Sequence, residues 1–265
     1  RVLANEGIDL LAVLGDERYL QVARRTGEFL LGPMRREDGG LWRTRRLGAS
    51  SHRGQLEDYA FVAQGLLDLW EADFDPRWLA GARALVRETD ARFGDVERGG
   101  WYDVDVKSAG ELPVRLSGAR EGALPSGTGV AALNALRLGL LAGEPDVVAR
   151  GHAAMRRYAG ELLHFPNAMS ALATALDFFA IEPDEVYVVG PPADPGVLEL
   201  VRRRRTQWPP DRVLASFPEP TEALIALLPA AEGKRAAADS ALVFVCRLGV
   251  CERPVPVAEA IAEER

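Results

Sequence analysis

Apolar residues recur at helical spacing along the chain as far as residue 180. Three segments are almost uncharged, and each is followed by a second segment whose charges lie on one side only. A helix that is apolar all round is buried, whereas a one-sided pattern is typical of a helix with a solvent-facing surface. The sequence therefore predicts helical hairpins in which an inner helix, at 3–14, 56–72 or 126–141, is followed by an outer one.

The hairpin recurs about every 60 residues. In each copy, two apolar residues open the outer helix and a small residue follows three positions later. The matching positions are Tyr19-Leu20 with Ala23, Trp78-Leu79 with Ala82, and Val147-Val148 with Gly151. After the first two outer helices come glycine pairs followed by aromatic residues, at 37–44 and 97–104, and these predict β-turns or short hairpins.

Repeated helical hairpins with turns projecting from one end are typical of an α/α toroid, in which inner helices line a funnel and outer helices surround them. A closed toroid needs about six hairpins, but this chain contains three and one further helix that starts at Asn167. The repeat alignment also places Arg1 inside an inner helix, opposite Ala60. We therefore expect a mainly α protein with a partial toroid over 1–181. It would be the C-terminal part of a longer or split protein and would require a partner half.

The end of the chain has a different pattern. Short apolar runs rich in β-branched residues lie at 185–190, 212–217 and 241–246, and a helical pattern at 195–208 separates the first two. This order of strand, helix and strand predicts a small α/β lobe over 182–265 with a mainly parallel sheet.

The charge balance limits the classes of partner. The 265 residues carry a formal net charge of -7, so no overall basic field is available to attract nucleic acid or anionic lipid. The basic run Arg202 to Arg205 lies in a helical pattern and is interpreted as a solvated face. No apolar run is long enough to span a membrane, and no signal peptide opens the chain. We expect a cytoplasmic protein that holds no cofactor and no metal.

Cys246 and Cys251 are separated by four residues, so they do not form the CxxC motif of a redox centre or a zinc site. Two cysteines are also too few for the disulfide framework of a small secreted domain. We expect two buried, reduced thiols, and thiol exchange with another protein is the alternative.

The candidate site residues lie where loops lead into the inner helices. The candidate catalytic residues are Glu57 and Asp58 at the second inner helix, Glu121 before the third, and His164 before the last. His52 and Tyr59 at the second inner helix and Ser126 at the third are candidates for substrate binding. Two carboxylates on different hairpins that face one cavity could cleave a glycosidic bond. Sugar epimerisation instead needs acid and base groups, often histidines, on opposite faces of a carbon atom. Alternatively, Glu57 and Asp58 merely complement the helix dipole, and the histidines have no task.

The stretch "PSGTG" raises a separate question. Ser126 is the expected N-cap, with a hydroxyl that can accept from a first-turn N–H group. Gly127 and Gly129 are not explained by capping, because glycine in the first turn of a helix costs stability. They leave space that a neighbouring helix or a polar ligand could occupy.

Aromatic residues follow the glycine pairs on both projecting turns: Trp42, Trp101 and Tyr102. Aromatic rings stack on the apolar faces of sugars, and Arg43 or Asp103 could add polar contacts. The same rings could equally anchor their own turns.

Five motifs occur in this order: "LEDYAFVAQGLLDLWEA", "GGWYD", "EGALPSGTGVAALNALRL", "EVYVVG" and "FVCRLGVCERPV". Together they resemble the C-terminal region of the YyaL-like thioredoxin-domain proteins, whose animal members are spermatogenesis-associated thioredoxin-like proteins. The resemblance implies a toroid similar to the N-acylglucosamine 2-epimerases and six-hairpin glycosidases, and an N-terminal thioredoxin-like domain that this stretch does not contain.

Two hypotheses follow. In the first, the chain belongs to a carbohydrate-active or carbohydrate-binding toroid with Glu57, Asp58, Glu121 and His164 around its funnel, by fold-level analogy. In the second, the toroid is a non-catalytic scaffold for the thioredoxin-like domain or a partner half, and the two cysteines could exchange with that domain.

Overall fold

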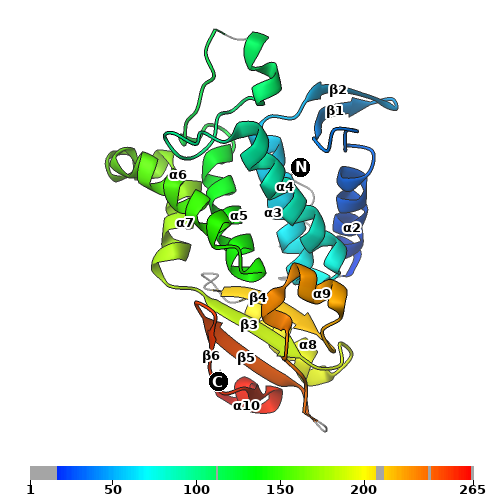
Figure 1. Ribbon diagram of the computed structural model, residues 1–265. Helices are drawn as coiled ribbons and strands as arrows, with labels where there is room; N and C mark the ends of the chain where they lie inside the picture. Colours follow the sequence, from blue (N-terminus) through cyan, green and yellow to red (C-terminus); the bar gives the residue numbers. More distant parts are fainter. Residues whose placement is uncertain (1–16, 112, 207–211, 238–239, 264–265) are drawn as a thin grey trace.

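The computed structural model describes residues 17–111, 113–206, 212–237 and 240–263. A helical part and a smaller part built on a β-sheet lie one above the other (Figure 1). The apolar segment 3–14 and the position of Arg1 lie outside the described residues. No helix in the described ranges combines the length and the apolar character that a membrane crossing requires.

Within the described residues, two helical hairpins and two further α-helices build the helical part. The helices are α2 (Glu17–Leu31), α3 (Leu56–Asp73), α4 (Pro76–Phe93), α5 (Gly127–Ala142), α6 (Pro145–His164) and α7 (Ser170–Ala180). α3, α5 and α7 pack side by side as an inner layer, and α4 and α6 pack against α3 and α5 (Figure 1). These two layers agree with the predicted inner and outer helices. Closure into a toroid stays a prediction.

Burial follows the hydrophobic pattern of each helix. In α3, the adjacent residues Leu66 and Leu67 are both buried, as expected of a helix covered on all sides. In α4, the buried apolar residues form one stripe that contains Trp78, Leu85 and Phe93. The turn between the two helices is closed by Asp75, whose carboxylate accepts from the Arg77 N–H at 3.0 Å as an N-cap.

Polar side chains connect the two central inner helices. Asn134 on α5 donates a hydrogen bond of 2.7 Å to the carbonyl of Ala60 on α3. Arg137 on α5 pairs with Asp68 at 2.7 Å and with Glu71 at 3.1 Å, both on α3. These interactions fix the register of α5 against α3, because a shift along the axis would leave buried polar groups unpaired.

Both glycine pairs form turns, as predicted, at the end of the helical part that is remote from the sheet (Figure 1). The first precedes an antiparallel hairpin of β1 (Trp42–Arg46) and β2 (Ala49–Arg53). The second closes a bridge between Gly94 and Trp101, and the chain continues into the 3-10 helix η1 (Val106–Glu111). Gly99 and Gly100 have φ values of 80° and 74°, which glycine adopts without strain.

A mixed sheet with its covering helices forms the smaller part. Its elements are β3 (Asp184–Val189), α8 (Pro195–Thr206), β4 (Arg212–Phe217), α9 (Glu222–Leu227), the 3-10 helix η3 (Pro229–Ala231), β5 (Leu242–Arg247), β6 (Val250–Cys251), β7 (Val255–Pro256) and α10 (Val257–Glu263). The strand order is β4-β3-β5-β6, and β7 pairs with β5. The prediction of a mainly parallel sheet is wrong. Among the described strands, only β3 and β4, joined by the crossover helix α8, run parallel, whereas β5 is antiparallel to β3.

The two parts share one interior. Tyr187 and Val189 of β3 pack in the same cluster as the helical core, whereas Val186 and Val188 point to the other face of the sheet, toward α8 and α10. The indole N–H of Trp70, near the end of α3, donates to the carbonyl of Leu214 on β4 at 3.2 Å. A division into domains 1–181 and 182–265 stays a prediction.

Candidate functional site

A cavity of about 490 Å³ lies at the amino ends of α3 and α5. Gln55, Leu56 and Glu57 form the side that belongs to α3, and Asp103 follows the second glycine-pair turn. The loop before α5 supplies the remaining wall, with Gly118, Arg120, Gly122, Ala123, Leu124, Pro125, Ser126 and Gly127. This is the end of the inner helices where the sequence places the candidate chemistry.

Glu57 faces this cavity, but its neighbour Asp58 does not. Arg43 on β1 donates to Glu57 Oε1 and to Asp58 Oδ2, each at 2.9 Å. Asp58 Oδ2 also accepts from the backbone N–H of Gln55 at 2.9 Å and completes a capping box at the start of α3. Asp58 is buried, so its contacts are those of a structural cap.

Asp103 is the second carboxylate of the cavity, and the sequence analysis assigned it only an accessory role. Its backbone N–H donates to the carbonyl of Leu116 at 2.8 Å, and its own carbonyl accepts from Leu56 at 3.0 Å. Burial raises the pKa of the Asp103 carboxyl, and the negative charge of Glu57 raises it further. The signal that could have found it is its position directly after "GGWY", on a turn that leads to the inner-helix ends.

Glu121 has a different role from the one predicted. Its carboxylate accepts from the Ser170 hydroxyl at 2.5 Å and from the Ala171 N–H at 2.6 Å, so it caps the start of α7. Burial raises the pKa of Glu121, but the hydrogen bonds from Ser170 and Ala171 outweigh it, and the net pKa is lowered. Glu121 is not among the residues that line the cavity of Glu57.

The two histidines are not brought together with the carboxylates of the cavity. His164 is exposed at the end of α6, with Nδ1 2.7 Å from the carbonyl of Gly160. His52 is exposed on β2 with φ of 59°, and neither histidine lines the cavity. Neither histidine is therefore placed to supply an acid or base group for epimerisation in the cavity of Glu57.

Trp101 and Tyr59 serve packing rather than an open binding surface. Trp101 is buried and its indole N–H donates to Asp90 Oδ1 at 2.7 Å. Tyr59 is buried edge-on against Phe93, and its hydroxyl accepts from the backbone N–H of Leu41 at 2.8 Å. Trp101 therefore anchors its own turn, which is the alternative that the sequence left open. Tyr59 of α3 instead holds the first glycine-pair turn through Leu41.

Tyr102 and Trp42 are partly exposed, and each is covered by an arginine. The guanidinium of Arg115 lies 4.1 Å from the Tyr102 ring centre, and that of Arg36 lies 4.8 Å from the Trp42 ring centre. Trp42 lines a separate cavity of about 470 Å³ between α2 and α3. Neither ring lines the cavity of Glu57 and Asp103.

Ser126 is the N-cap of α5, as predicted, and its hydroxyl accepts from the Gly129 N–H at 3.0 Å. Neighbouring helices occupy the space beside both first-turn glycines. A Cβ on Gly127 would lie 3.0 Å from the backbone nitrogen of Glu57, and one on Gly129 would lie 2.6 Å from that of Leu172. Close packing of α3 and α7 thus explains both glycines.

The prediction of two reduced thiols is wrong, because Cys246 and Cys251 form a disulfide. They are directly opposite each other on β5 and β6, with Cα atoms 3.8 Å apart. Hairpin pairing brings the two side chains to one side of the strands, which a reading of the spacing alone did not anticipate. Cys246 is buried, whereas Cys251 is exposed.

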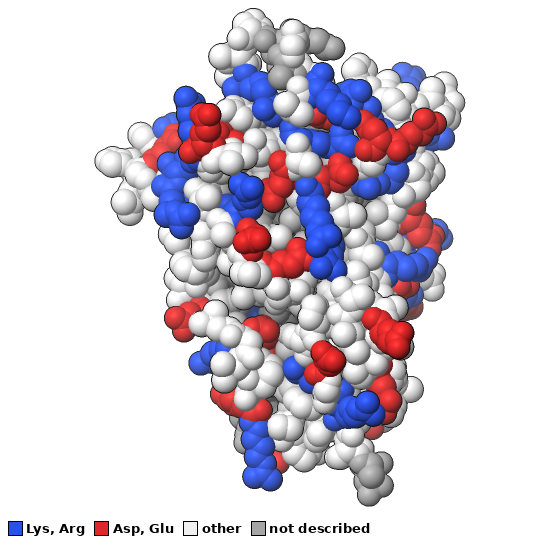
Figure 2. Space-filling model, in the orientation of Figure 1, with Lys and Arg blue, Asp and Glu red and all other residues white. Residues whose placement is uncertain are grey.

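Charges of both signs are interspersed over the face shown in Figure 2. Within the described ranges, no three His, Cys, Asp or Glu side chains are placed to hold a metal ion. Three charged side chains of described residues line the cavity. The carboxylates of Glu57 and Asp103 can bind hydroxyl groups and transfer protons, and the guanidinium of Arg120 can donate hydrogen bonds.

No protein-family model matches the chain. The chain is 30% identical over 254 residues to spermatogenesis-associated protein 20 of Homo sapiens, a match that covers 92% of this chain and 32% of that protein. The match to the Rattus norvegicus protein has the same extent, and the Mus musculus protein is 29% identical over 203 residues. These matches support the resemblance to the spermatogenesis-associated protein 20 family. The chain spans about a third of the length of these relatives.

Proposed function

We propose that this chain is the carbohydrate-binding or carbohydrate-active part of a thioredoxin-domain-containing protein, and that the cavity of Glu57 and Asp103 is its ligand site. The observation that carries the proposal is the presence of two carboxylates on one cavity, one at the start of α3 and the other on the turn that follows α4. Carboxylates and a guanidinium are the groups that bind sugar hydroxyls in pairs. The proposal replaces the predicted partner Glu121 with Asp103.

Asp103 is suited to donate a proton. A carboxyl group with a raised pKa retains its proton at a higher pH than an ordinary aspartate, which is the requirement for a general acid. Glu57 is oriented by its hydrogen bond to Arg43 and is suited to accept a proton or a hydroxyl hydrogen bond. An epimerase-like or a glycosidase-like reaction would both use this pair.

Calorimetric titration of the chain with glucose, N-acetylglucosamine and N-acetylmannosamine tests the proposal. We expect at least one sugar to bind, and Glu57→Gln and Asp103→Asn each to weaken binding about tenfold, the effect of about 1.4 kcal/mol from a lost hydrogen bond to a charged group. Glu97→Gln, at an exposed turn, is the control. Absence of binding by all three sugars, or unchanged affinity in both variants, would contradict the proposal.

The alternative function, a scaffold for a thioredoxin-like domain, is favoured by the disulfide hairpin. Cys251 is exposed, and Leu248 and Val250 beside it are 78% and 75% exposed. An exposed disulfide flanked by apolar side chains suits docking of a dithiol protein. Attack of a thiolate on the Cys251 sulfur would release the Cys246 thiolate and form a mixed disulfide. The second thiol of the partner would then resolve that bond, which leaves two thiols here and a disulfide in the partner.

Incubation with a reduced thioredoxin-like domain tests this alternative by mass spectrometry. We expect the chain to gain two hydrogens, and a partner that lacks its second cysteine to remain attached through Cys251. Leu248→Asp should slow the exchange, whereas Val96→Asp, at an exposed turn elsewhere, should not. No mixed disulfide would count against a role for this hairpin.

A partner half of the toroid is the remaining proposal. Leu176 and Phe179 on α7, the last helix of the inner layer, are 42% and 46% exposed. Large apolar side chains on a helix face support coverage by another element. We expect Leu176→Glu with Phe179→Glu to abolish self-association or partner binding in light scattering. A wild-type chain that remains monomeric with and without the upstream half would contradict this proposal.

A further inference from the structure

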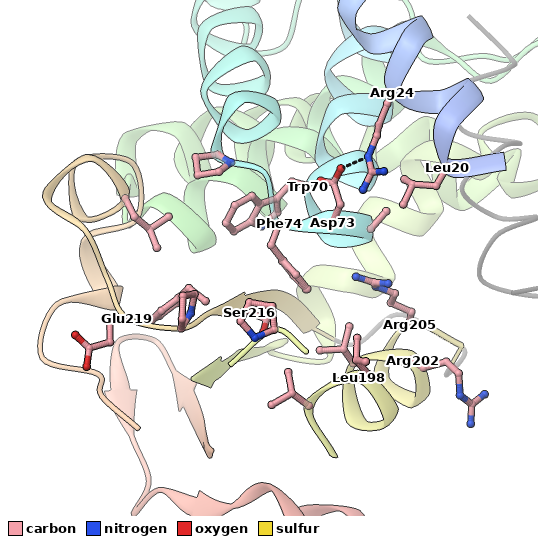
Figure 3. A pocket seen from close by; sticks show the side chains of 18 of the residues that line it. Leu20, Arg24, Trp70, Asp73, Phe74, Leu198, Arg202, Arg205, Ser216 and Glu219 are labelled. Atoms are coloured by element: carbon pink, nitrogen blue, oxygen red, sulfur yellow. Dashed lines mark hydrogen bonds and ion pairs between the residues drawn. The ribbon is translucent and has the colours of Figure 1, made fainter. Parts of the chain in front are cut away.

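A second cavity lies between the helical part and the sheet. Its volume is about 810 Å³, and it is bounded by the carboxyl end of α3, by α8 and by the end of β4 (Figure 3). It lies at the opposite end of α3 from the cavity of Glu57. Neither the predicted sites nor the proposed function involves it.

Arg205 on α8 faces this cavity, toward Phe74 (Figure 3). The guanidinium carbon lies 5.2 Å from the centre of the Phe74 ring, and the Nε atom is buried without a hydrogen-bond partner. Arg24 and Arg202, which also line the cavity, hydrogen-bond carboxylates at Asp73 and Glu199. The interpretation of the run Arg202 to Arg205 as a solvated face is therefore wrong for Arg205.

The carboxylates nearest to Arg205 are already bound to other donors. Asp73 accepts from Arg24 at 2.7 Å, and Glu71 accepts from Arg137 at 3.1 Å. Burial lowers the pKa of Arg205 to about 10, although Glu71 and Asp73 attract its charge. The buried Nε of Arg205 donates no hydrogen bond to a described residue, which is costly, and an oxyanion that enters the cavity would remove that cost.

The lining determines which oxyanion fits. Among the described residues, the lining contains three arginines and three carboxylates, so its formal charges balance. They are Arg24, Arg202 and Arg205, and Glu17, Asp73 and Glu219. Most of the other lining residues are apolar, among them Trp70, Leu198 and Phe217. A polyphosphate would need a stronger basic field, whereas one carboxylate on an apolar body matches one free guanidinium in an apolar cavity.

The topology gives independent support for a ligand here. β3 and β4 run parallel, so their carboxyl ends lie at the same edge of the sheet. Pro192, from the loop after β3, and Ser216, Phe217 and Pro218, from the end of β4, line the cavity. The edge at the carboxyl ends of parallel strands is where α/β sheets place their ligands.

We propose that the cavity between α3, α8 and β4 binds a small organic monocarboxylate with an apolar body, and that Arg205 holds the carboxylate while the apolar lining packs around the rest. The ligand would connect the helical part to the sheet, because Trp70 and Phe74 belong to the former and Arg205 and Phe217 to the latter.

Calorimetric titration with 4-phenylbutyrate, its neutral amide and inorganic phosphate tests the proposal on the 265-residue chain. We expect the carboxylate to bind at least tenfold more tightly than the amide or phosphate. Arg205→Met should reduce its affinity at least tenfold, because the apolar contacts remain and the charge is lost. Arg203→Met, on the same helix but outside the cavity lining and with its Nε held by Glu199, should change the affinity less than twofold.

Three results would overturn the proposal. They are equal binding of the acid and the amide by the wild-type chain, a larger loss in Arg203→Met than in Arg205→Met, and no binding of the acid. The comparison of acid with amide uses the wild-type chain alone, so it tests whether the carboxylate is recognised even if Arg205→Met fails to fold.

Discussion

Gly127 lies directly against the backbone of Glu57, where an added Cβ would stand 3.0 Å from the Glu57 nitrogen and 3.1 Å from its Cα. Two residues later, Gly129 packs even more closely against the backbone of α7. A Cβ added there would lie 2.6 Å from the nitrogen of Leu172. The first turn of α5 is thus wedged between α3 and α7. The same close approach brings Glu57 to the wall of the candidate cavity, so the packing of these glycines also positions the site.

Gly129→Ala should destabilise the chain, because the new methyl group would contact backbone atoms that cannot rotate away. We expect a loss of about 1–3 kcal/mol in the free energy of unfolding, as for other overpacked positions. Gly160→Ala is the matched control, since this glycine is in helix α6 with nothing within 4 Å of its Cβ position. That change should add about 0.5–1 kcal/mol through helix propensity. Urea unfolding of both variants measures the two changes in the free energy of unfolding. Equal changes would contradict the close packing of Gly129 against α7.

Glu121→Gln should destabilise the chain at neutral pH by about 0.5–2 kcal/mol, as expected for loss of a helix cap. The lowered pKa of Glu121 in the folded state means that its stabilisation is present above the unfolded pKa and is lost as the pH falls through the folded pKa. The difference between wild type and variant should therefore shrink in acid. Urea unfolding between pH 7 and pH 3 measures it, with Glu97→Gln as control. A stability difference between wild type and Glu121→Gln that does not depend on pH would contradict a role of the Glu121 carboxylate as the cap of α7.

Asp103→Asn should stabilise the chain at neutral pH. A carboxyl whose pKa is raised on folding binds its proton more tightly in the folded state, so stability falls as the pH rises from the unfolded pKa through the folded pKa. The amide carries no charge, so the variant avoids this loss, and the two proteins should become equally stable in acid. Thermal unfolding across this pH range measures the effect. Lower stability of Asp103→Asn at neutral pH would show that Asp103 is a structural residue rather than part of a ligand site.

Reduction of the disulfide should lower stability without unfolding the chain. The loop between Cys246 and Cys251 is short, so its closure contributes about 2 kcal/mol in the chain-entropy description. A variant with alanine at both positions should match the reduced protein in its melting temperature and should not respond to reductant. If reductant still lowered the melting temperature of this variant, the loss of stability would not come from the disulfide.

The hydrophobic pattern was sufficient to predict the helical hairpins. Trp78, Leu85 and Phe93 lie on one side of α4 because a helical period places them there. The more apolar α3 is buried over most of its surface, and a stripe that includes Phe61 and Gln64 is half-buried. The local chemistry of turns was also readable, as the caps by Asp75 and Ser126 show. Such features depend on residues that are close in sequence.

The sites depended on contacts between residues that are distant in sequence. Glu121 looked like a cavity residue beside α5, but the backbone N–H groups of α7 bind its carboxylate. Asp103 looked accessory, but the loop before α5 encloses it beside Glu57. The basic run predicted a solvated Arg205, but the packing of α8 near the end of α3 directs this side chain toward a cavity.

The sequence by itself determined the helical hairpins, the inner and outer layers and the resemblance to the spermatogenesis-associated protein 20 family, because these follow from periodicity and motif order. Only the tertiary structure decided which carboxylates share a cavity, that β5 runs antiparallel to β3, and that the two cysteines pair. Burial, charge partners and strand direction are set by which elements lie next to each other, and periodicity within one element carries no information about its neighbours.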